Sequence, residues 1–473
     1  MRNALVAAGL AAAALIGLIV AVIVSSGSGG GIASSLSRAA SPATGAPTGS
    51  TARTVTQPQG TRPATGSGTH TTQTRPGSRP THHPAITYDS DTTVSLPTTT
   101  AAIPPPPPPH SSRVRTFSVG VVDDSLAQPT LAATSMAVAA SQRAGFDTVV
   151  VSVGWSRGVK RPSPSALHRL GNISSAARKH HMRLFLVIGN GYAPNTPRTA
   201  AERAEFASFA AATVEAVPHV AAVTVGNEPN LNTFWMPQFT PNGRDAAAPA
   251  YEDLLARTYD AVKKVAPDMT VIGGAVSPRG ADRPNGIRPT HSPTVFIRDL
   301  GKAYRASGRR RPIMDAFGIH PYMIAPWVSP KERHPYTGEI TFADYPKLVT
   351  LLDEAFRGTH QRGRTLPIYY SEFGVQTLIP DSKLSAYSEG STIESTWGVS
   401  AATQAAYYRQ ALALAYCQPT VKGLFVFHTF DEPSMNGWQS GLYYADHTPK
   451  PSLQAFRRTV DDLRDGKLVT CGR

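Results

Sequence analysis

From residue 116 to the C-terminus, short runs of β-branched and apolar residues alternate with longer stretches in which apolar positions recur every three or four residues. Short apolar runs are typical of buried parallel strands, and the three- and four-residue spacing is typical of helices that bury one face. The runs predict strands at residues 116–122, 148–153, 183–188, 222–226, 270–275, 316–320, 367–371 and 423–428. The pattern therefore predicts repeated strand–helix units with parallel strands.

The helical periodicity is clearest between residues 251 and 265. The apolar positions that we expect on one buried face are Tyr251, Leu254, Leu255, Tyr259, Val262 and Val265. A last helix is predicted near residues 452–464. Eight strand–helix units predict an α/β fold of the (β/α)8 TIM barrel type. A doubly wound open sheet is the alternative, but no Gly-rich phosphate loop follows the first predicted strand.

The N-terminal quarter of the chain has a different composition. Residues 4–24 form an uncharged apolar run behind Arg2, long enough to cross a bilayer, which takes about 20 apolar residues. We expect a single-pass transmembrane helix in the cell membrane with the rest of the chain extracellular; a signal segment of a secreted protein is the alternative. Residues 25–115 are rich in Ser, Thr, Pro and Gly and predict a disordered linker, so the barrel is expected over residues 116–473.

The net charge of +14 is divided between the linker and the barrel region. No basic run is interleaved with aromatic residues, so we expect no nucleic-acid partner. A solvated basic surface, or attraction to an anionic cell envelope, accounts for the charge. We expect a monomer.

The chain has two cysteines, Cys417 and Cys471, placed near the ends of the last two predicted helices. A disulfide between them is possible outside the cytoplasm. A buried thiol and a separate thiol in the C-terminal tail are the alternative.

Two glutamates follow strands on opposite sides of the predicted barrel. Glu228 stands in Gly-Asn-Glu-Pro-Asn after the fourth strand, and Glu372 stands in Ser-Glu-Phe-Gly after the seventh. Active sites of TIM barrels are built at the C-terminal ends of the strands, so these side chains are expected to face each other there. Cleavage of a glycosidic bond needs one carboxylic acid and one carboxylate. We assign Glu372 as nucleophile and Glu228 as acid and then base.

These two segments, together with Gly-Ile-His-Pro-Tyr after the sixth strand, resemble the motifs of the clan A glycoside hydrolases, with features of families 39 and 5. The resemblance covers the whole predicted barrel. It implies a retaining glycosidase in which Asn227 holds the sugar 2-hydroxyl. It also implies that His320 lines the site and that Tyr322 donates its hydroxyl to Glu372.

Further substrate contacts are expected from aromatic and polar residues after the strands. All five tryptophans follow predicted strands: Trp155, Trp235, Trp327, Trp397 and Trp438. Indole rings suit the apolar C–H faces of sugars, and we expect substrate contacts from Trp235, Trp155 and Trp438, and from Asn190 and Phe430. Many clan members end the eighth strand with a tryptophan; this chain does not, and Phe430 or Trp438 would take its place.

Three acidic residues at strand ends have two interpretations. Asp123, Asp124 and Asp431 either shape sugar subsites or cap helices and brace loops.

The sequence thus predicts an enzyme that hydrolyses β-linked glycosides within an oligosaccharide or polysaccharide. No metal or organic cofactor is implied, and no Gly-x-Ser-x-Gly segment indicates an esterase. Two alternatives remain open: a surface transglycosylase with the same site, and a catalytically silent protein that binds polysaccharide.

Overall fold

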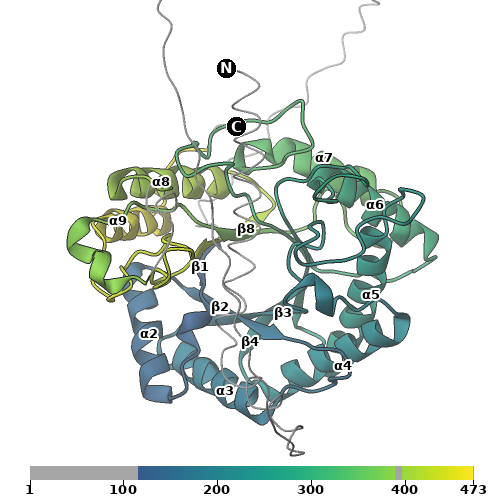
Figure 1. Cartoon of the computed structure of the whole chain (residues 1–473), viewed down its shortest axis with the longest axis horizontal. Helices are drawn as coiled ribbons and strands as arrows, with labels where there is room; N and C mark the ends of the chain where they lie inside the picture. Colours follow the sequence, from purple (N-terminus) through teal and green to yellow (C-terminus); the bar gives the residue numbers. More distant parts are fainter. Residues whose placement is uncertain (1–115, 389–396, 472–473) are drawn as a thin grey trace, which may run out of the picture. The chain divides into compact units, whose positions relative to one another are not determined.

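In the computed structural model, which describes residues 116–388 and 397–471, eight parallel strands form a closed barrel in sequence order (Figure 1). The strands are β1 Ser118–Val122, β2 Thr148–Gly154, β3 Arg183–Gly189, β4 Val220–Val225, β5 Thr270–Val276, β6 Ala316–Ile319, β7 Ile368–Phe373 and β8 Val421–Phe427. β8 pairs in parallel with β1 and closes the ring. The predicted TIM barrel is confirmed, and each strand lies within two residues of its expected ends.

Helices surround the barrel in Figure 1. They are α2 Leu131–Ala144, α3 Pro164–Lys179, α4 Ala200–Ala216, α5 Ala247–Val265, α6 Pro293–Ala306, α7 Tyr345–Phe356, α8 Ala401–Tyr416 and α9 Ser452–Arg464. Side-chain caps start several of them: Thr199 and Glu202 form a reciprocal capping box at α4, and Ser292 accepts from the backbone of Val295 at α6. The predicted last helix is confirmed.

The predicted buried face of α5 is largely confirmed. Its fully buried members are Tyr251, Leu254, Leu255 and Val262, and Tyr259 packs partly on the core. The prediction is wrong for Val265, which is 41% exposed because the helix ends there. The Tyr251 hydroxyl donates to the carbonyl of Val225 at 2.7 Å and accepts from the amide of Gly274 at 2.8 Å. This one side chain therefore fixes the C-terminal end of β4 against β5.

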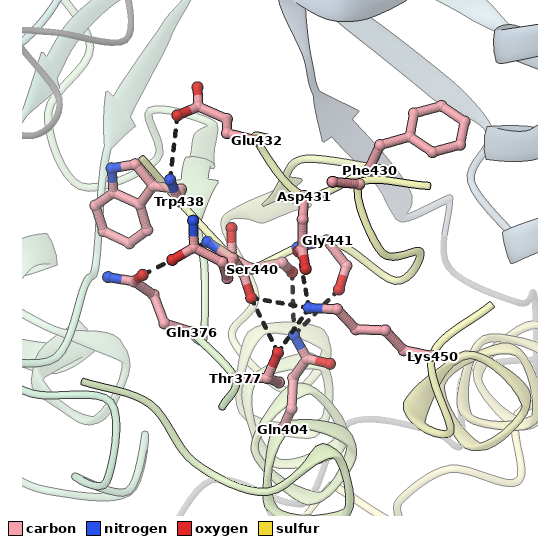
Figure 2. Close-up of polar contacts among 12 residues, drawn as sticks. Gln376, Thr377, Gln404, Phe430, Asp431, Glu432, Trp438, Ser440, Gly441 and Lys450 are labelled. Atoms are coloured by element: carbon pink, nitrogen blue, oxygen red, sulfur yellow. Dashed lines mark hydrogen bonds and ion pairs between the residues drawn. The ribbon is translucent and has the colours of Figure 1, made fainter. Parts of the chain in front are cut away.

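A buried ion pair ties together the two long loops that follow β7 and β8 (Figure 2). The Lys450 ammonium donates to Asp431 Oδ1 at 2.7 Å, to Thr377 Oγ1 at 2.6 Å and to the carbonyl of Gln439 at 2.9 Å. Both charged side chains are completely excluded from solvent. The second carboxylate oxygen of Asp431 accepts from the Tyr387 hydroxyl at 2.6 Å. Of the two interpretations of Asp431, the structure favours the loop brace.

The two cysteines form a disulfide between Cys417, which caps the C-terminus of α8, and Cys471, which follows α9. The bridge therefore links the last two helices of the barrel. The alternative of two separate thiols is excluded.

The expected anchor at residues 4–24 and the linker at residues 25–115 lie outside the described residues. Among the helices of residues 116–388 and 397–471, none is long and apolar enough to cross a membrane.

The buried ion pair gives a first prediction. Replacing Lys450 by Met leaves the Asp431 carboxylate buried without a cation, and we expect this to lower the free energy of unfolding by about 3–5 kcal/mol. Urea denaturation followed by circular dichroism measures the change.

The matched control is the double variant Lys450→Met/Asp431→Asn, which keeps an acceptor for the Gly441 amide but removes the charge. We expect it to recover most of the lost stability. A double variant as unstable as the single one would show that the unpaired charge is not the cause.

Candidate active site

Glu228 lies in a strained turn directly after β4. The backbone turns through the left-handed region at Gly226 (φ 77°) and again at Glu228 (φ 39°). Left-handed conformations are uncommon for residues with a Cβ and are found most often at functional sites. The Glu228 amide donates to the carbonyl of Ala275 in β5 at 2.9 Å, which holds the turn in place. Glu372 needs no such turn, because it is the second-last residue of β7.

The two glutamates meet at one imidazole nitrogen. His320, directly after β6, places its Nδ1 3.0 Å from Glu228 Oε1 and 3.8 Å from Glu372 Oε2. Since both distances are measured to the same nitrogen, the two oxygens lie no farther apart than the sum of the distances. That limit is compatible with the separation of about 5 Å between carboxyl groups that is typical of retaining glycosidases. The structure thus brings Glu228, Glu372 and His320 together.

Tyr322 holds the other oxygen of Glu372. Its hydroxyl donates to Glu372 Oε1 at 2.7 Å, as the resemblance implied. The backbone of Tyr322 is fixed by Arg279, whose two terminal nitrogens donate to the Tyr322 carbonyl at 2.7 and 2.9 Å. Arg279 is itself paired with Glu339 at 3.0 Å. Arg279 was not found from the sequence, because nothing in its neighbourhood indicates that it reaches a loop after another strand.

The site is nearly closed to solvent, which governs its electrostatics. Glu228 and Glu372 are 7% and 8% exposed. Burial raises the pKa of Glu372, and Glu228 raises it further; His320 and the Tyr322 hydroxyl bond act in the opposite direction. Burial alone would lower the pKa of His320, but the two carboxylates outweigh it and raise that pKa. The two carboxylates therefore favour the protonated form of the His320 imidazole.

Asn227 lies beside Glu228, and Trp438 lies beside Tyr322. Asn227 is half-buried beside Glu228, and its side chain makes no hydrogen bond to another described residue. The Trp438 ring lies 5.0 Å from the ring of Tyr322 and 5.5 Å from that of Phe427, measured between centroids. Of the two aromatic residues expected to replace the missing tryptophan of strand eight, Trp438 is the one beside the reaction centre.

Phe430 packs elsewhere. Its ring lies 5.4 Å from that of Tyr443 and stacks on His447 at 4.3 Å. Figure 2 shows the Phe430 ring pointing away from Trp438. It belongs to the small core of the loop after β8, so we do not retain it as a substrate contact.

Three other expected substrate contacts are also turned into the protein. Trp155 is 1% exposed and donates its indole N–H to the carbonyl of Val159 at 2.8 Å. Trp235 is 2% exposed and packs edge-on against Tyr251. The amide of Asn190 donates to the carbonyls of Tyr192 and Phe234. These residues support the loops after β2, β3 and β4, and their side chains are almost entirely buried.

The acidic residues at the ends of β1 and β8 divide between the two interpretations. Asp123 braces loops: it accepts from the amides of Ser125 at 2.9 Å and Thr429 at 2.8 Å. Asp124 remains partly exposed, and its carboxylate contributes to raising the pKa of Glu372. Glu432, which was not singled out from the sequence, is largely buried; burial chiefly, with Asp124 among its neighbours, raises its pKa to about 8. Asp124 therefore acts on the pKa of both Glu372 and Glu432, and its own carboxylate accepts from the amide of Ser152 at 2.6 Å.

Within the described residues, no group of three or more His, Cys, Asp or Glu side chains is arranged to hold a metal ion.

No family model matches the sequence, and no curated protein matches it. The exo-β-1,4-mannosidase Op5Man5 from Opitutaceae bacterium strain TAV5 is 16% identical with a TM-score of 0.47, over 75% of this chain and 60% of the mannosidase. A GH5_18 protein from Streptomyces cattleya, solved with GlcNAc, is 17% identical with a TM-score of 0.48, over 76% of this chain and 83% of that one.

A GH39 enzyme from Xanthomonas axonopodis pv. citri is 16% identical with a TM-score of 0.45, over 73% of this chain and 66% of that one. All three carry the names of glycoside hydrolases or their families, the enzymes whose motifs the sequence resembles. At these identities and TM-scores the similarity assigns neither an activity nor a substrate to this chain.

Proposed function

We propose that the protein is a retaining glycoside hydrolase that cleaves β-linked O-glycosidic bonds in an oligosaccharide or polysaccharide. The observation that carries the proposal is the meeting of Glu228 and Glu372 at His320 Nδ1, at the C-terminal ends of strands on different sides of a TIM barrel. Two carboxyl groups close enough to act on one anomeric carbon are what double displacement requires.

The proposed reaction has two steps. In the first, Glu228 gives its proton to the glycosidic oxygen while Glu372 attacks the anomeric carbon, so that the leaving sugar departs and a glycosyl ester forms on Glu372. In the second, Glu228 takes a proton from a water molecule that attacks the same carbon. The ester bond breaks, the free sugar leaves, and both carboxyl groups return to their starting state.

The assignment of roles rests on hydrogen bonding. The Tyr322 hydroxyl donates to Glu372 and stabilises its charged form, which a nucleophile needs. Glu228 is instead paired with the imidazole of His320, at 3.0 Å from Nδ1. The raised pKa of Glu372 is caused mainly by its burial and also by the neighbouring Glu228, so it does not separate the two roles. Asn227, adjacent to Glu228, is available for the sugar 2-hydroxyl.

The first test replaces each glutamate by glutamine. We expect Glu228→Gln and Glu372→Gln to lower kcat on aryl β-glycosides by a factor of about 10²–10⁴ or more, with an unchanged circular dichroism spectrum. Glu332→Gln, an exposed glutamate in the loop after β6, is the control and should keep full activity. Full activity in either site variant contradicts the proposal, and a first product of inverted anomeric configuration, seen by proton NMR, contradicts retention.

A second test uses the pH profile. The Tyr322 bond lowers the pKa of Glu372, so Tyr322→Phe should raise it and move the acidic limb of kcat/KM to higher pH. Activity then falls more at acidic than at neutral pH. Tyr304→Phe, which removes a hydroxyl bond to the carbonyl of Arg311, is the matched control. An acidic limb that stays in place in Tyr322→Phe would rule out this role for the hydroxyl.

We further propose that residues 4–24 anchor the protein in the cell membrane with the barrel outside. The apolar run supports an anchor, and the Cys417–Cys471 disulfide supports an oxidising compartment. We expect the protein in the membrane fraction and the barrel accessible to protease added to intact cells, with deletion of residues 1–24 as control. Recovery of the barrel from the medium without residues 1–24 favours the secreted alternative. A barrel that is protected from the added protease and has reduced thiols overturns both the anchored and the secreted location.

A further inference from the structure

The hydrogen-bonded ladder between β4 and β5 ends before the turn that carries Glu228. The last residues in register are Thr224 and Ile272, and the backbone at Glu228 is left-handed, with φ 39°. The Glu228 amide still reaches the carbonyl of Ala275 at 2.9 Å, but Pro229 has no amide hydrogen to donate. The backbone therefore cannot continue a regular ladder beyond the turn.

The side chain of Asn230 takes the place of the missing backbone groups. Its Oδ1 accepts from the amide of Ser277, the residue directly after β5, at 2.9 Å, and its Nδ2 donates to the Ser277 carbonyl at 3.2 Å. A side-chain amide has the same kinds of donor and acceptor as a peptide group, so these two bonds resemble one rung of a ladder. The two strands are thus joined both before and after Glu228.

The same side chain also fixes the loop between β5 and α6. Asn230 Nδ2 donates to the carbonyl of His291 at 3.0 Å, and the His291 amide donates back to the Asn230 carbonyl at 2.9 Å. The His291 ring is buried and is itself held in place, since its Nε2 lies 2.9 Å from the carbonyl of Gln238. Asn230 therefore connects the turn with two buried segments of the chain.

Removal of the Asn230 amide would release the turn. Asn230 is completely buried and offers no surface to a substrate, but without it the amide and carbonyl of Ser277 lose a partner inside the protein. A left-handed backbone persists only where its surroundings fix it. We therefore expect the released turn to relax and to move the Glu228 carboxyl away from His320 Nδ1, which now lies 3.0 Å from it.

We propose that Asn230 is a positioning residue that holds the Glu228 carboxyl where it protonates the departing oxygen. The inference rests on the proposed function and deepens it, because it separates the support of the acid from that of the nucleophile. Glu372 is placed by β7 and by the Tyr322 hydroxyl, so loss of the Asn230 amide displaces the acid and spares the nucleophile.

The test varies how much the leaving group needs an acid. A phenyl group departs slowly unless its oxygen is protonated, whereas a 2,4-dinitrophenyl group departs as a stable anion. We use both aryl β-glycosides of glucose, mannose, galactose and xylose and compare kcat/KM, which reports the steps up to departure of the leaving group. In Asn230→Ala we expect kcat/KM for the phenyl glycoside to fall at least about tenfold and that for the dinitrophenyl glycoside to stay within about threefold.

Asn172→Ala is the matched control. This buried asparagine also donates to a backbone carbonyl, that of Pro129 at 3.1 Å, but it lies in α3. We expect Asn172→Ala to lower the melting temperature and to leave the ratio of kcat/KM for the two substrates unchanged. Glu228→Gln shows the ratio that results when the acid itself is lost.

Three results overturn the inference: an equal loss on both substrates in Asn230→Ala, no loss on the phenyl glycoside, or the same change of ratio in Asn172→Ala. In each case the proposed function stands if Glu228→Gln still discriminates between the two leaving groups.

Asn230→Asp keeps the test decisive if Asn230→Ala does not fold. The new carboxyl group faces the carbonyls of Ser277 and His291, and burial raises its pKa. Below that pKa the protonated group donates to a carbonyl and holds the turn; above it the carboxylate repels both carbonyls. The loss on the phenyl glycoside relative to the dinitrophenyl glycoside should therefore grow with pH in Asn230→Asp. A pH dependence that parallels that of the unmodified enzyme overturns the inference.

If the unmodified enzyme hydrolyses none of these glycosides, the proposed function has failed, and an NMR titration of the imidazoles tests the positioning alone. Glu372 and the contact with Glu228 both raise the pKa of His320, so relaxation of the turn in the Asn230 variants should lower that pKa. Asn172→Ala should leave it unchanged. The His320 signal is identified by its absence in His320→Asn, and an unchanged His320 pKa in the Asn230 variants overturns the inference.

Discussion

The site depends on one constraint: two buried carboxyl groups must be held within reach of the same point. Like charges repel strongly when water is excluded, so a second group has to compensate. His320 does this by contacting both glutamates through one nitrogen, and its raised pKa is the consequence. The Tyr322 hydroxyl secures the remaining oxygen of Glu372. The burial of the two glutamates, their pairing with His320 and their relative position therefore depend on one another.

The barrel brings the two glutamates together because its parallel strands all end at the same rim. Glu372 is placed by β7 itself, but Glu228 requires a left-handed backbone, and Ala275, whose carbonyl receives the Glu228 amide, is also left-handed at φ 47°. Such strain persists only where the surroundings fix it. Tyr251 fixes the end of β4 from outside the barrel, and Asn230 bonds to the amide and carbonyl of Ser277. The catalytic turn is thus held by the strand pair β4 and β5 together.

The fold and the centre of the site could both be predicted from the sequence, and for the same reason. Strand periodicity located the rim, and polar residues directly after strands, such as His320 and Tyr322, have little freedom to point elsewhere. Residues several positions farther along a loop do have that freedom. Trp235 and Phe430 turned inward to build loop cores, whereas Trp438 turned towards Tyr322.

Partners from distant loops carry no local signal at all. Lys450 and Asp431 are separated by a turn and a long loop, and nothing near Arg279 in sequence indicates that it holds the backbone of Tyr322. Such pairings follow from the packing of one loop on another, which periodicity does not describe.

The distribution of charge around the rim constrains the substrate further. Asp124 contributes to the raised pKa values of both Glu372 and Glu432. The cations that act on the site are already engaged, His320 with the two glutamates and Arg279 with Glu339. Burial keeps the pKa of His428 low, so it adds no positive charge near neutral pH. An anionic sugar would therefore lose hydration at this buried site without gaining a new ion pair from these cations, a cost that a neutral sugar avoids.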